Sequence, residues 1–404
     1  MRRLHCLLLG TRAGSGAAAH LPIIATKENN MAIQLFVPKE QALGERRVAI
    51  SPPAAAKLKS LGVELLLESG AGISAGFPDK LFTDSRWVSA ADGAATADVV
   101  FKVLAPAPVN IARMKAGSAL IGLLNPYRNL DAVKALRDKK VTSFSMELVP
   151  RISRAQAMDA LSSQAAASGY KAALLAAEKL ARFFPMLTTA AGTIRPAKVL
   201  VIGAGVAGLQ AIATAKRLGA MVEGYDVRAV AREQVESLGA KFVDTGVSAE
   251  GTGGYARELT AEEKQKQQDA LAKHMAQADA VITTAAIPGR TAPRIISRAM
   301  VESMKTGAVI VDLAAETGGN CELTKPGNEV QVSGVVICGQ TDLASRMAGD
   351  TSLLYANNIV RFVLHLVRDG KVRDDLDDEI LGATCVVHGG SLRGAAAPHP
   401  EPVA

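Results

Sequence analysis

The feature that most constrains this chain is a glycine-rich turn between an apolar run and a helical segment. The run Lys198–Ile202 leads directly into Gly203-Ala-Gly205-Val206-Ala-Gly208. In this pattern the first glycine permits a tight turn, the second lets a pyrophosphate approach the backbone, and the third lets helix and strand pack closely. The N–H groups and positive dipole end of the helix attract phosphates. The sequence therefore predicts dinucleotide binding at Gly203, Gly205, Val206 and Gly208.

An acidic residue indicates which dinucleotide is bound. A second apolar run, Met221–Tyr225, ends at Asp226, about 20 residues after the glycine motif, where the fold places an acid. A carboxylate there accepts hydrogen bonds from the ribose diol of NAD and repels the 2′-phosphate of NADP. We therefore expect NAD(H), with Val227 and Arg228 beside it. Arg228 could attract a phosphate, but the nearer Asp226 argues against that. The alternative is that Asp226 is a solvated turn acid.

Composition and charge exclude several classes of protein. With 404 residues the chain exceeds what one core usually supports, so we expect two domains. Hydrophobic residues make up 49% and charged residues 21%, as in ordinary globular proteins, and no segment is a credible transmembrane span. Four basic residues and one acidic residue among the first thirty hold +3 of the +7 net charge, and no basic helix follows, so nucleic acid is not expected as a partner. The four cysteines are far apart, without a Cys-x-x-Cys pair or a histidine cluster, so we expect reduced thiols and no metal site.

Strand-like apolar runs alternate with helical patterns in both halves of the chain. In the first half these runs are Ile33–Val37, Val63–Leu67, Val99–Val103, Ala119–Leu123 and Val141–Ser145. In the second half they are Val199–Ile202, Met221–Tyr225, Ala280–Thr284, Ala308–Asp312 and Val335–Cys338. Such alternation is typical of a parallel sheet with helices on both faces. We therefore predict an α/β protein with two doubly wound, parallel-sheet (Rossmann-like) domains joined by two long helices, from 153 to about 183 and from 343 to about 367.

The predicted first domain is discontinuous, because the second long helix returns the chain to it. It takes residues 31–152 and 343–387, the NAD-binding domain takes residues 153–342, and the nicotinamide would project into the cleft between them. Residues 1–30 read as an extension. Either the upstream start is misassigned and Met31 is the real start, or the segment is a targeting signal. Residues 388–404 are rich in Gly, Ala and Pro, and we expect a disordered tail.

Several motifs occur in the order in which one known family carries them. They are Val37-Pro-Lys-Glu40, Glu45-Arg-Arg-Val-Ala-Ile-Ser-Pro52, Val100-Phe-Lys-Val103, Leu209-Gln-Ala-Ile-Ala-Thr-Ala-Lys-Arg-Leu-Gly219 and Asp312-Leu-Ala-Ala-Glu-Thr-Gly-Gly319. From about Ile33 to Arg368 the chain thus resembles the family of alanine dehydrogenases and NAD(P) transhydrogenase alpha subunits.

The two branches of that family differ in their chemistry. An alanine dehydrogenase needs a general base, and that branch supplies a His after the fourth strand of its first domain and an Asp further on. In this chain the segment that corresponds to the His position reads Ile121-Gly-Leu-Leu-Asn-Pro-Tyr-Arg128 and contains no His. The acid at the position of the Asp is Glu316. Arg47 and Lys102 match that branch's carboxylate-binding residues, and we interpret them as inherited polar groups. The resemblance therefore favours the transhydrogenase branch, in which hydride passes directly between two nicotinamides.

That branch carries a loop between the domains, and it is present as Pro150-Arg-Ile-Ser-Arg-Ala-Gln-Ala-Met-Asp159-Ala-Leu-Ser162. The resemblance implies that Arg151 lies by the phosphates and nicotinamide ribose, and that Gln156, Asp159 and Ser162 orient the nicotinamide. Arg151, Gln156 and Asp159 are therefore the candidate catalytic residues. From the residues alone, Asp159 could merely compensate the dipole of the following helix.

Two further segments resemble nucleotide contacts of the family. The glycine-rich stretch 251–258 is similar to a mobile loop that folds over bound nucleotide, which implies contacts from Gly254 and Tyr255. The turn 284–289, with Ala286, and the segment Asp226-Val227-Arg228 match contacts on the adenosine side. An ordinary exposed loop is the alternative for the glycine-rich stretch.

The resemblance implies an NAD(H)-binding alpha subunit of a proton-translocating NAD(P) transhydrogenase. Hydride would pass from NADH to NADP⁺ held by a separate NADP(H)-binding beta subunit, with a membrane-spanning subunit moving the protons. We expect a homodimer in the cytoplasm, attached to the inner membrane through those partners. An alanine dehydrogenase-like amino acid dehydrogenase is the alternative, and a non-catalytic NAD(H)-sensing module is a third possibility.

Overall fold

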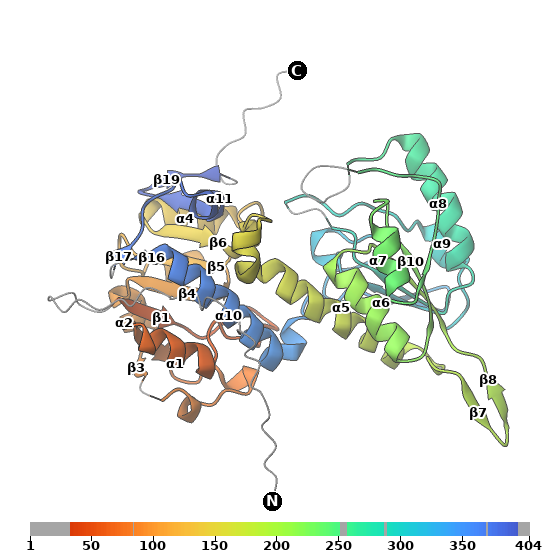
Figure 1. Cartoon of the computed structure of the whole chain (residues 1–404), viewed down its shortest axis with the longest axis horizontal. Helices are drawn as coiled ribbons and strands as arrows, with labels where there is room; N and C mark the ends of the chain where they lie inside the picture. The colour runs from red at the N-terminus through yellow and green to blue at the C-terminus, as the bar shows by residue number, and fades with distance from the viewer. Residues whose placement is uncertain (1–32, 84, 251–256, 287–288, 369–370, 395–404) are drawn as a thin grey trace, which may run out of the picture.

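A computed structural model describes residues 33–83, 85–250, 257–286, 289–368 and 371–394. The chain forms two lobes, each built on a mainly parallel sheet covered by helices on both faces (Figure 1). Two long helices, α5 (Ala160–Lys179) and α10 (Ala348–Leu366), lie where the lobes meet. The predicted fold class is confirmed.

The first lobe contains an eight-stranded sheet in the order β19-β18-β6-β5-β4-β1-β2-β3. Six strands are parallel, and β18 joins β6 antiparallel. The strands are β1 (Gln34–Val37), β2 (Glu64–Glu68), β3 (Arg86–Val88), β4 (Val99–Leu104), β5 (Ala119–Leu123), β6 (Thr142–Ser145), β18 (Cys385–His388) and β19 (Ser391–Leu392). The helices are α1 (Pro52–Ser60), α2 (Ala90–Thr96), α3 (Pro108–Ile111), α4 (Leu130–Asp138) and α11 (Glu379–Thr384).

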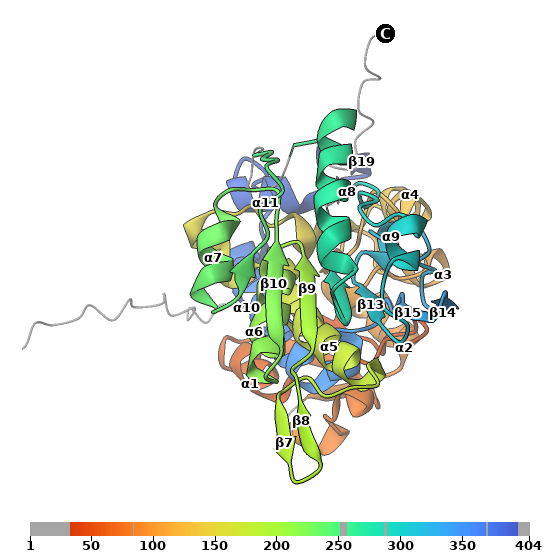
Figure 2. The same ribbon diagram turned by 90° about the vertical axis from the view of Figure 1, so that its right-hand side faces the viewer.

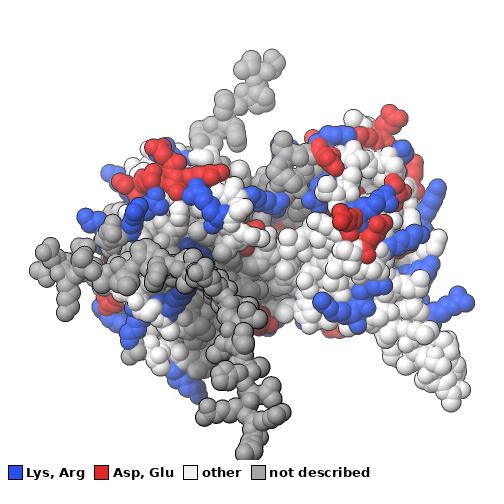
Figure 3. All heavy atoms as spheres, viewed as in Figure 1, with Lys and Arg blue, Asp and Glu red and all other residues white. Residues whose placement is uncertain are grey.

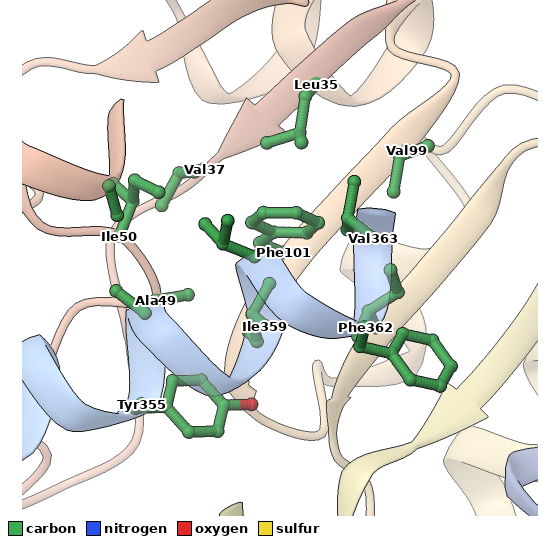
Figure 4. Close-up of a cluster of buried hydrophobic side chains, with 14 of the residues drawn as sticks. Leu35, Val37, Ala49, Ile50, Val99, Phe101, Tyr355, Ile359, Phe362 and Val363 are labelled. Carbon is green, nitrogen blue, oxygen red and sulfur yellow. The ribbon is translucent and has the colours of Figure 1, made fainter. Parts of the chain in front are cut away.

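Helix α10 supplies much of the first lobe's core, although it lies more than 200 residues beyond the strands it covers. Its residues Ile359, Phe362 and Val363 pack on Leu35 and Phe101 of the sheet (Figure 4). Helix α1 covers the same face, and α2, α3 and α4 cover the other. The apolar stripe of α10 is what returns the C-terminal part of the chain to the first lobe.

The second lobe contains a seven-stranded sheet in the order β11-β10-β9-β12-β13-β15-β14, in which only β14 is antiparallel (Figure 2). Its strands are β9 (Lys198–Ile202), β10 (Met221–Tyr225), β11 (Lys241–Phe242), β12 (Ala280–Thr283), β13 (Val309–Asp312), β14 (Glu329–Val332) and β15 (Val335–Cys338). Helices α5, α6 (Val206–Arg217) and α7 (Ala231–Ser237) cover one face, and α8 (Ala261–Met275) and α9 (Arg298–Glu302) cover the other.

The long helix at the first join is shorter than the sequence predicts. Residues Ser153–Met158 form a 3₁₀ turn instead, and α5 starts only after Asp159, whose side chain accepts a hydrogen bond from the N–H of Ser162. A carboxylate at this position satisfies an N–H group that the helix leaves unpaired, so the cap fixes where α5 begins.

Short edge elements escaped prediction because they bury few apolar residues. The clearest is the β7–β8 hairpin (Leu187–Thr189 and Gly192–Ile194), which projects from the second lobe and carries no charged side chain (Figure 3). A second small ribbon pairs β16 (Val367–Arg368) with β17 (Lys371–Val372). The expected disordered tail is wrong in its first residues, because His388 ends β18 and residues 391–392 pair with it as β19.

Candidate functional site

The glycine turn after β9 has the geometry that its sequence predicts. Gly203 has a φ of +96°, which favours glycine, and a Cβ there would lie 2.6 Å from Oγ1 of Thr284. A Cβ on Gly208 would overlap the carbonyl oxygen of Gly203. At Gly205, by contrast, a Cβ would meet no atom of the described residues within 4 Å. The turn therefore needs its first and third glycines for folding, and leaves open space over the second.

Helix α6 begins in that open space. Gly205 is its N-cap, no side chain of the described residues caps the helix, and Val206, the first helical residue, is exposed. Unpaired N–H groups at a helix start bind anions, and glycine allows a close approach. The residues present thus fit the pyrophosphate of a dinucleotide.

Asp226 lies directly beside the glycine turn. It is 9% exposed, and its Oδ2 accepts a hydrogen bond of 2.7 Å from the N–H of Ala204. The guanidinium of Arg228 grips the same carboxylate, with Nε 2.8 Å from Oδ1 and Nη2 2.8 Å from Oδ2. Burial alone would raise the pKa of Asp226, but the hydrogen bonds from Arg228 and Ala204 outweigh it and lower that pKa. The acid is therefore ionised, and it neutralises Arg228. Val227 follows Asp226 and packs against the second-lobe core.

The sheet order reverses between β9 and β12, so ligands of such folds bind outside these strand ends. Here the hydroxyl of Thr284 donates to the carbonyl of Gly203 (3.0 Å) and fastens the two turns together. Fully buried Asn320 holds the next residue, Ala285, by accepting from its N–H (3.0 Å) and donating to its carbonyl (2.7 Å). Sequence reasoning missed Asn320, although a polar residue soon after the strand Val309–Asp312 was an available signal. Ala286, a predicted contact, is exposed at this turn.

The predicted loop residues fall on the 3₁₀ turn and the start of α5. Arg151 and Gln156 are exposed, and the Gln156 amide makes no hydrogen bond to the described residues. Asp159 and Ser162 are paired, because Asp159 accepts from both the N–H (2.8 Å) and the hydroxyl (2.7 Å) of Ser162. Helix capping is therefore enough to explain why an acid stands at position 159. The Gln156 side chain, by contrast, makes no contribution to the folding of the turn that the structure shows.

Helix α5 connects this loop to the glycine turn. Gly169 on α5 packs so closely on α6 that a Cβ there would overlap the carbonyl oxygen of Ala207. Ten residues separate Asp159 from this contact, which at a rise of 1.5 Å per residue corresponds to about 15 Å. A ligand that contacts both the loop and the glycine turn must therefore be extended, as a dinucleotide is.

The two lobes also touch through the segment in which alanine dehydrogenases carry their His. The ring of Tyr127 lies against Gly289, and Nη1 of Arg128 is 3.6 Å from Oε1 of Glu316. Glu316 is thus held in an exposed ion pair with Arg128. The described histidines lie elsewhere: His274 pairs with Glu223, His365 with Asp378, and His388 with Thr142. Within the described residues no histidine is placed to act as a base where the two lobes touch.

Arg47 and Lys102 are both engaged by buried carboxylates of the first lobe. Nη2 of Arg47 is 2.6 Å from Oε2 of Glu45, and Nζ of Lys102 is 2.8 Å from Oε2 of Glu40. Burial raises the pKa of Glu40, although the ammonium of Lys102 opposes the effect. These cations are therefore partnered within the chain.

Some predictions lie outside the described residues or concern absences. Gly254 and Tyr255 fall within 251–256, which the structure does not describe. In the described part, no group of three or more His, Cys, Asp or Glu side chains could hold a metal ion, and no helix is long and apolar enough to cross a membrane. Cys321, Cys338 and Cys385 are free and buried.

Comparisons with known proteins agree with this geometry. Models of the alanine dehydrogenase/PNT N-terminal and C-terminal domains match residues 36–168 and 172–394. The chain is 47% identical over 374 residues to an NAD(P) transhydrogenase subunit alpha polypeptide of Rhodospirillum rubrum, and the match covers 89% of this chain and 97% of that protein. The crystal structure of transhydrogenase from Sinorhizobium meliloti has a TM-score of 0.81 at 46% identity, covering 89% of this chain and 99% of the other. Alanine dehydrogenase of Halomonas elongata is 28% identical over 368 residues, covering 89% of this chain and 94% of that protein.

Proposed function

Because the chain belongs to the alanine dehydrogenase/PNT family, we propose that it is the NAD(H)-binding alpha subunit of an NAD(P) transhydrogenase. In this role it holds NADH while hydride passes to NADP⁺ on a partner subunit. The observation that carries the proposal is a glycine turn whose open space fits a pyrophosphate, in a molecule whose described residues offer no histidine base where the two lobes touch. The greater identity to transhydrogenase subunits than to an alanine dehydrogenase supports the same branch.

The residues of the chain position the cofactor and leave the chemistry to it. The bound nicotinamide would supply the hydride. The start of α6 holds the pyrophosphate, Asp226 accepts from the adenosine ribose, and Arg151, Gln156, Asp159 and Ser162 orient the nicotinamide end. We include Gly254, Tyr255 and Ala286 in this proposed site on the strength of the resemblance. The arrangement requires no proton transfer by the chain, and the two cations that match the carboxylate-binding residues of alanine dehydrogenases, Arg47 and Lys102, are paired with carboxylates of the chain itself.

The preference for NAD(H) over NADP(H) is proposed to come from Asp226. An Asp226→Ala variant loses the carboxylate that repels a 2′-phosphate, and the positive charge of Arg228 is no longer balanced by that carboxylate. The ratio of the Kd of NADPH to that of NADH should fall about tenfold, equivalent to about 1.4 kcal/mol. Fluorescence titration with both nucleotides measures it. The matched control is Asp244→Ala, which breaks an exposed ion pair with Arg232 on the same lobe. Equal discrimination in both variants would remove the assigned role of Asp226.

Gln156 is proposed to orient the nicotinamide without anchoring the cofactor. In Gln156→Asn the amide is withdrawn by one methylene, so hydride transfer should slow about tenfold while NADH affinity changes little. Single-turnover kinetics and a binding titration separate the two effects. Gln234→Asn, an exposed position on α7, is the control. A loss confined to affinity would contradict the orienting role.

The finer assignments of partners and location follow from the same role. We propose an NADP(H)-binding beta subunit and a membrane-spanning subunit as partners, with this chain in the cytoplasm and peripheral to the inner membrane through them. The reaction would be coupled to proton transfer across the membrane. We also propose a homodimer. The β7–β8 hairpin supports it, since an uncharged two-stranded ribbon is marginal in water unless another surface covers it.

The function is tested by mixing the purified chain with the NADP(H)-binding and membrane subunits. We expect hydride transfer from NADH to an NADP⁺ analogue, and no reduction of NAD⁺ by the isolated chain with L-alanine. Robust turnover with L-alanine would establish the dehydrogenase instead. NADH binding without transfer in the complete mixture would favour a sensing module.

A further inference from the structure

The 3₁₀ turn that carries Gln156 is anchored to a helix nearly 200 residues away. Asn358 of α10 is 9% exposed, and its Nδ2 donates a 3.0 Å hydrogen bond to the carbonyl of Ala157, the residue after Gln156. Its Oδ1 accepts a 2.8 Å hydrogen bond from the hydroxyl of Ser163 on α5. A carbonyl can only accept, so the amide group must face Ala157 and leave its oxygen for Ser163. One side chain thus joins the turn, α5 and α10.

The anchor belongs to a buried polar network. Nε2 of Gln164 donates to the hydroxyl of Ser163 (3.2 Å) and to the carbonyl of Thr351 on α10 (3.1 Å). Its Oε1 accepts from Nη1 of Arg47 (2.8 Å), which is itself paired with Glu45. The network therefore runs from the loop after β1 to the backbone beside Gln156, and it gives Arg47 a task within the fold. Breaking a buried, satisfied network is costly, because it leaves polar groups unpaired.

Packing fixes the direction in which the turn presents Gln156. Ala155 and Met158, three residues apart, are buried in the first-lobe core, as a 3₁₀ turn with three residues per turn allows. Gln156 consequently points outward. A second tie, between Arg154 and the carboxylates of Asp378 and Glu379 at 3.3 Å each, is about half exposed and therefore weak. The buried hydrogen bond from Asn358 to Ala157 is therefore the strongest polar contact between this turn and the rest of the first lobe.

We propose that Asn358 is a positioning residue for hydride transfer, which acts by holding the Ala157 carbonyl and thereby the Gln156 side chain beside the nicotinamide. This inference rests on the proposed function. Asn358 itself is buried and does not reach the cofactor, so it should influence the rate through Gln156 and leave NADH affinity nearly unchanged.

The test is Asn358→Asp, which keeps the size and the acceptor but loses the donor to Ala157. Its matched control is Asn357→Asp, the same change at the exposed neighbouring position of α10. Since a misplacement of about 1 Å can cost about 10²-fold in rate, we expect a fall of about tenfold in single-turnover hydride transfer, with the Kd of NADH within about twofold of wild type. In the free chain, hydrogen–deuterium exchange of the peptide spanning 153–158 should accelerate. Neither effect should appear in Asn357→Asp.

A second variant covers the case in which Asn358→Asp does not fold. Ser163→Ala removes the hydroxyl that orients the Asn358 amide, so we expect a smaller loss of rate and the same faster exchange. The melting temperature should fall modestly, because Asn358 and Gln164 each lose one hydrogen-bond partner. Wild-type rates and wild-type exchange in the folded variants would overturn the inference. If the wild-type chain itself transfers no hydride in the complete mixture, the proposed function fails, and the exchange measurement still decides whether Asn358 holds the turn.

Discussion

A Gly205→Ala variant is expected to keep its fold and to bind NADH about 10²-fold more weakly. In the structure a Cβ at this position meets no described atom within 4 Å, and the φ of −77° suits alanine. That space is where we propose that a pyrophosphate reaches the N–H groups of α6. A methyl group would keep it away and cost one or two charge-assisted hydrogen bonds, or about 3 kcal/mol. At 1.4 kcal/mol per factor of ten, the Kd rises about 10²-fold.

The measurements are a fluorescence titration with NADH and a urea unfolding curve. Because alanine is a poorer N-cap than glycine, the free energy of unfolding should fall by about 1 kcal/mol or less. Binding lost together with a large loss of stability would mean that the glycine serves the fold rather than the ligand. Binding at wild-type affinity would place the cofactor away from this turn.

A Gly208→Ala variant should show the opposite result, a large loss of stability. Its Cβ would overlap the carbonyl oxygen of Gly203, which is backbone and cannot rotate away. Two further hydrogen bonds hold Gly203 in place. Its carbonyl accepts from the hydroxyl of Thr284 (3.0 Å), and its N–H donates to the carbonyl of Tyr225 (2.8 Å). Relieving the overlap must move the turn or α6, and we expect about 3 kcal/mol of destabilisation, at the upper end of the usual cost of overpacking.

The measurement is the free energy of chemical unfolding of Gly208→Ala compared with that of Gly205→Ala. The comparison is matched, because each change adds one methyl group and the two positions are three residues apart. NADH should also bind weakly to Gly208→Ala, because the displaced turn no longer presents its N–H groups. Equal unfolding free energies for the two variants would show that the close contact between helix and strand is dispensable.

Local signals predicted a good part of the fold. Runs such as Val99–Val103 and Ala280–Thr284 became strands β4 and β12 within one residue, because buried parallel strands are apolar throughout. Helix α8 (Ala261–Met275) also begins at a local signal, since Thr260 and Glu263 form a capping box at its start. The β7–β8 hairpin and edge strands β3 and β11 were missed, because neither burial nor alternation marks such short, exposed elements. Edge strand β14 was missed although its sequence Glu-Val-Gln-Val alternates between exposed and half-buried residues.

The sequence by itself determined that a strand, a glycine turn and a helix form the corner at which we propose that the pyrophosphate binds, and it put an acid at the end of the next strand. These properties depend on residues close together in the chain, where glycine, periodicity and capping act locally. Only the tertiary structure decided that Thr284 holds the carbonyl of Gly203, and that Asn358 holds the turn of Gln156 across 201 residues of chain. Such contacts arise from how helices and sheets pack against each other, and side-chain spacing along a sequence carries no record of that packing.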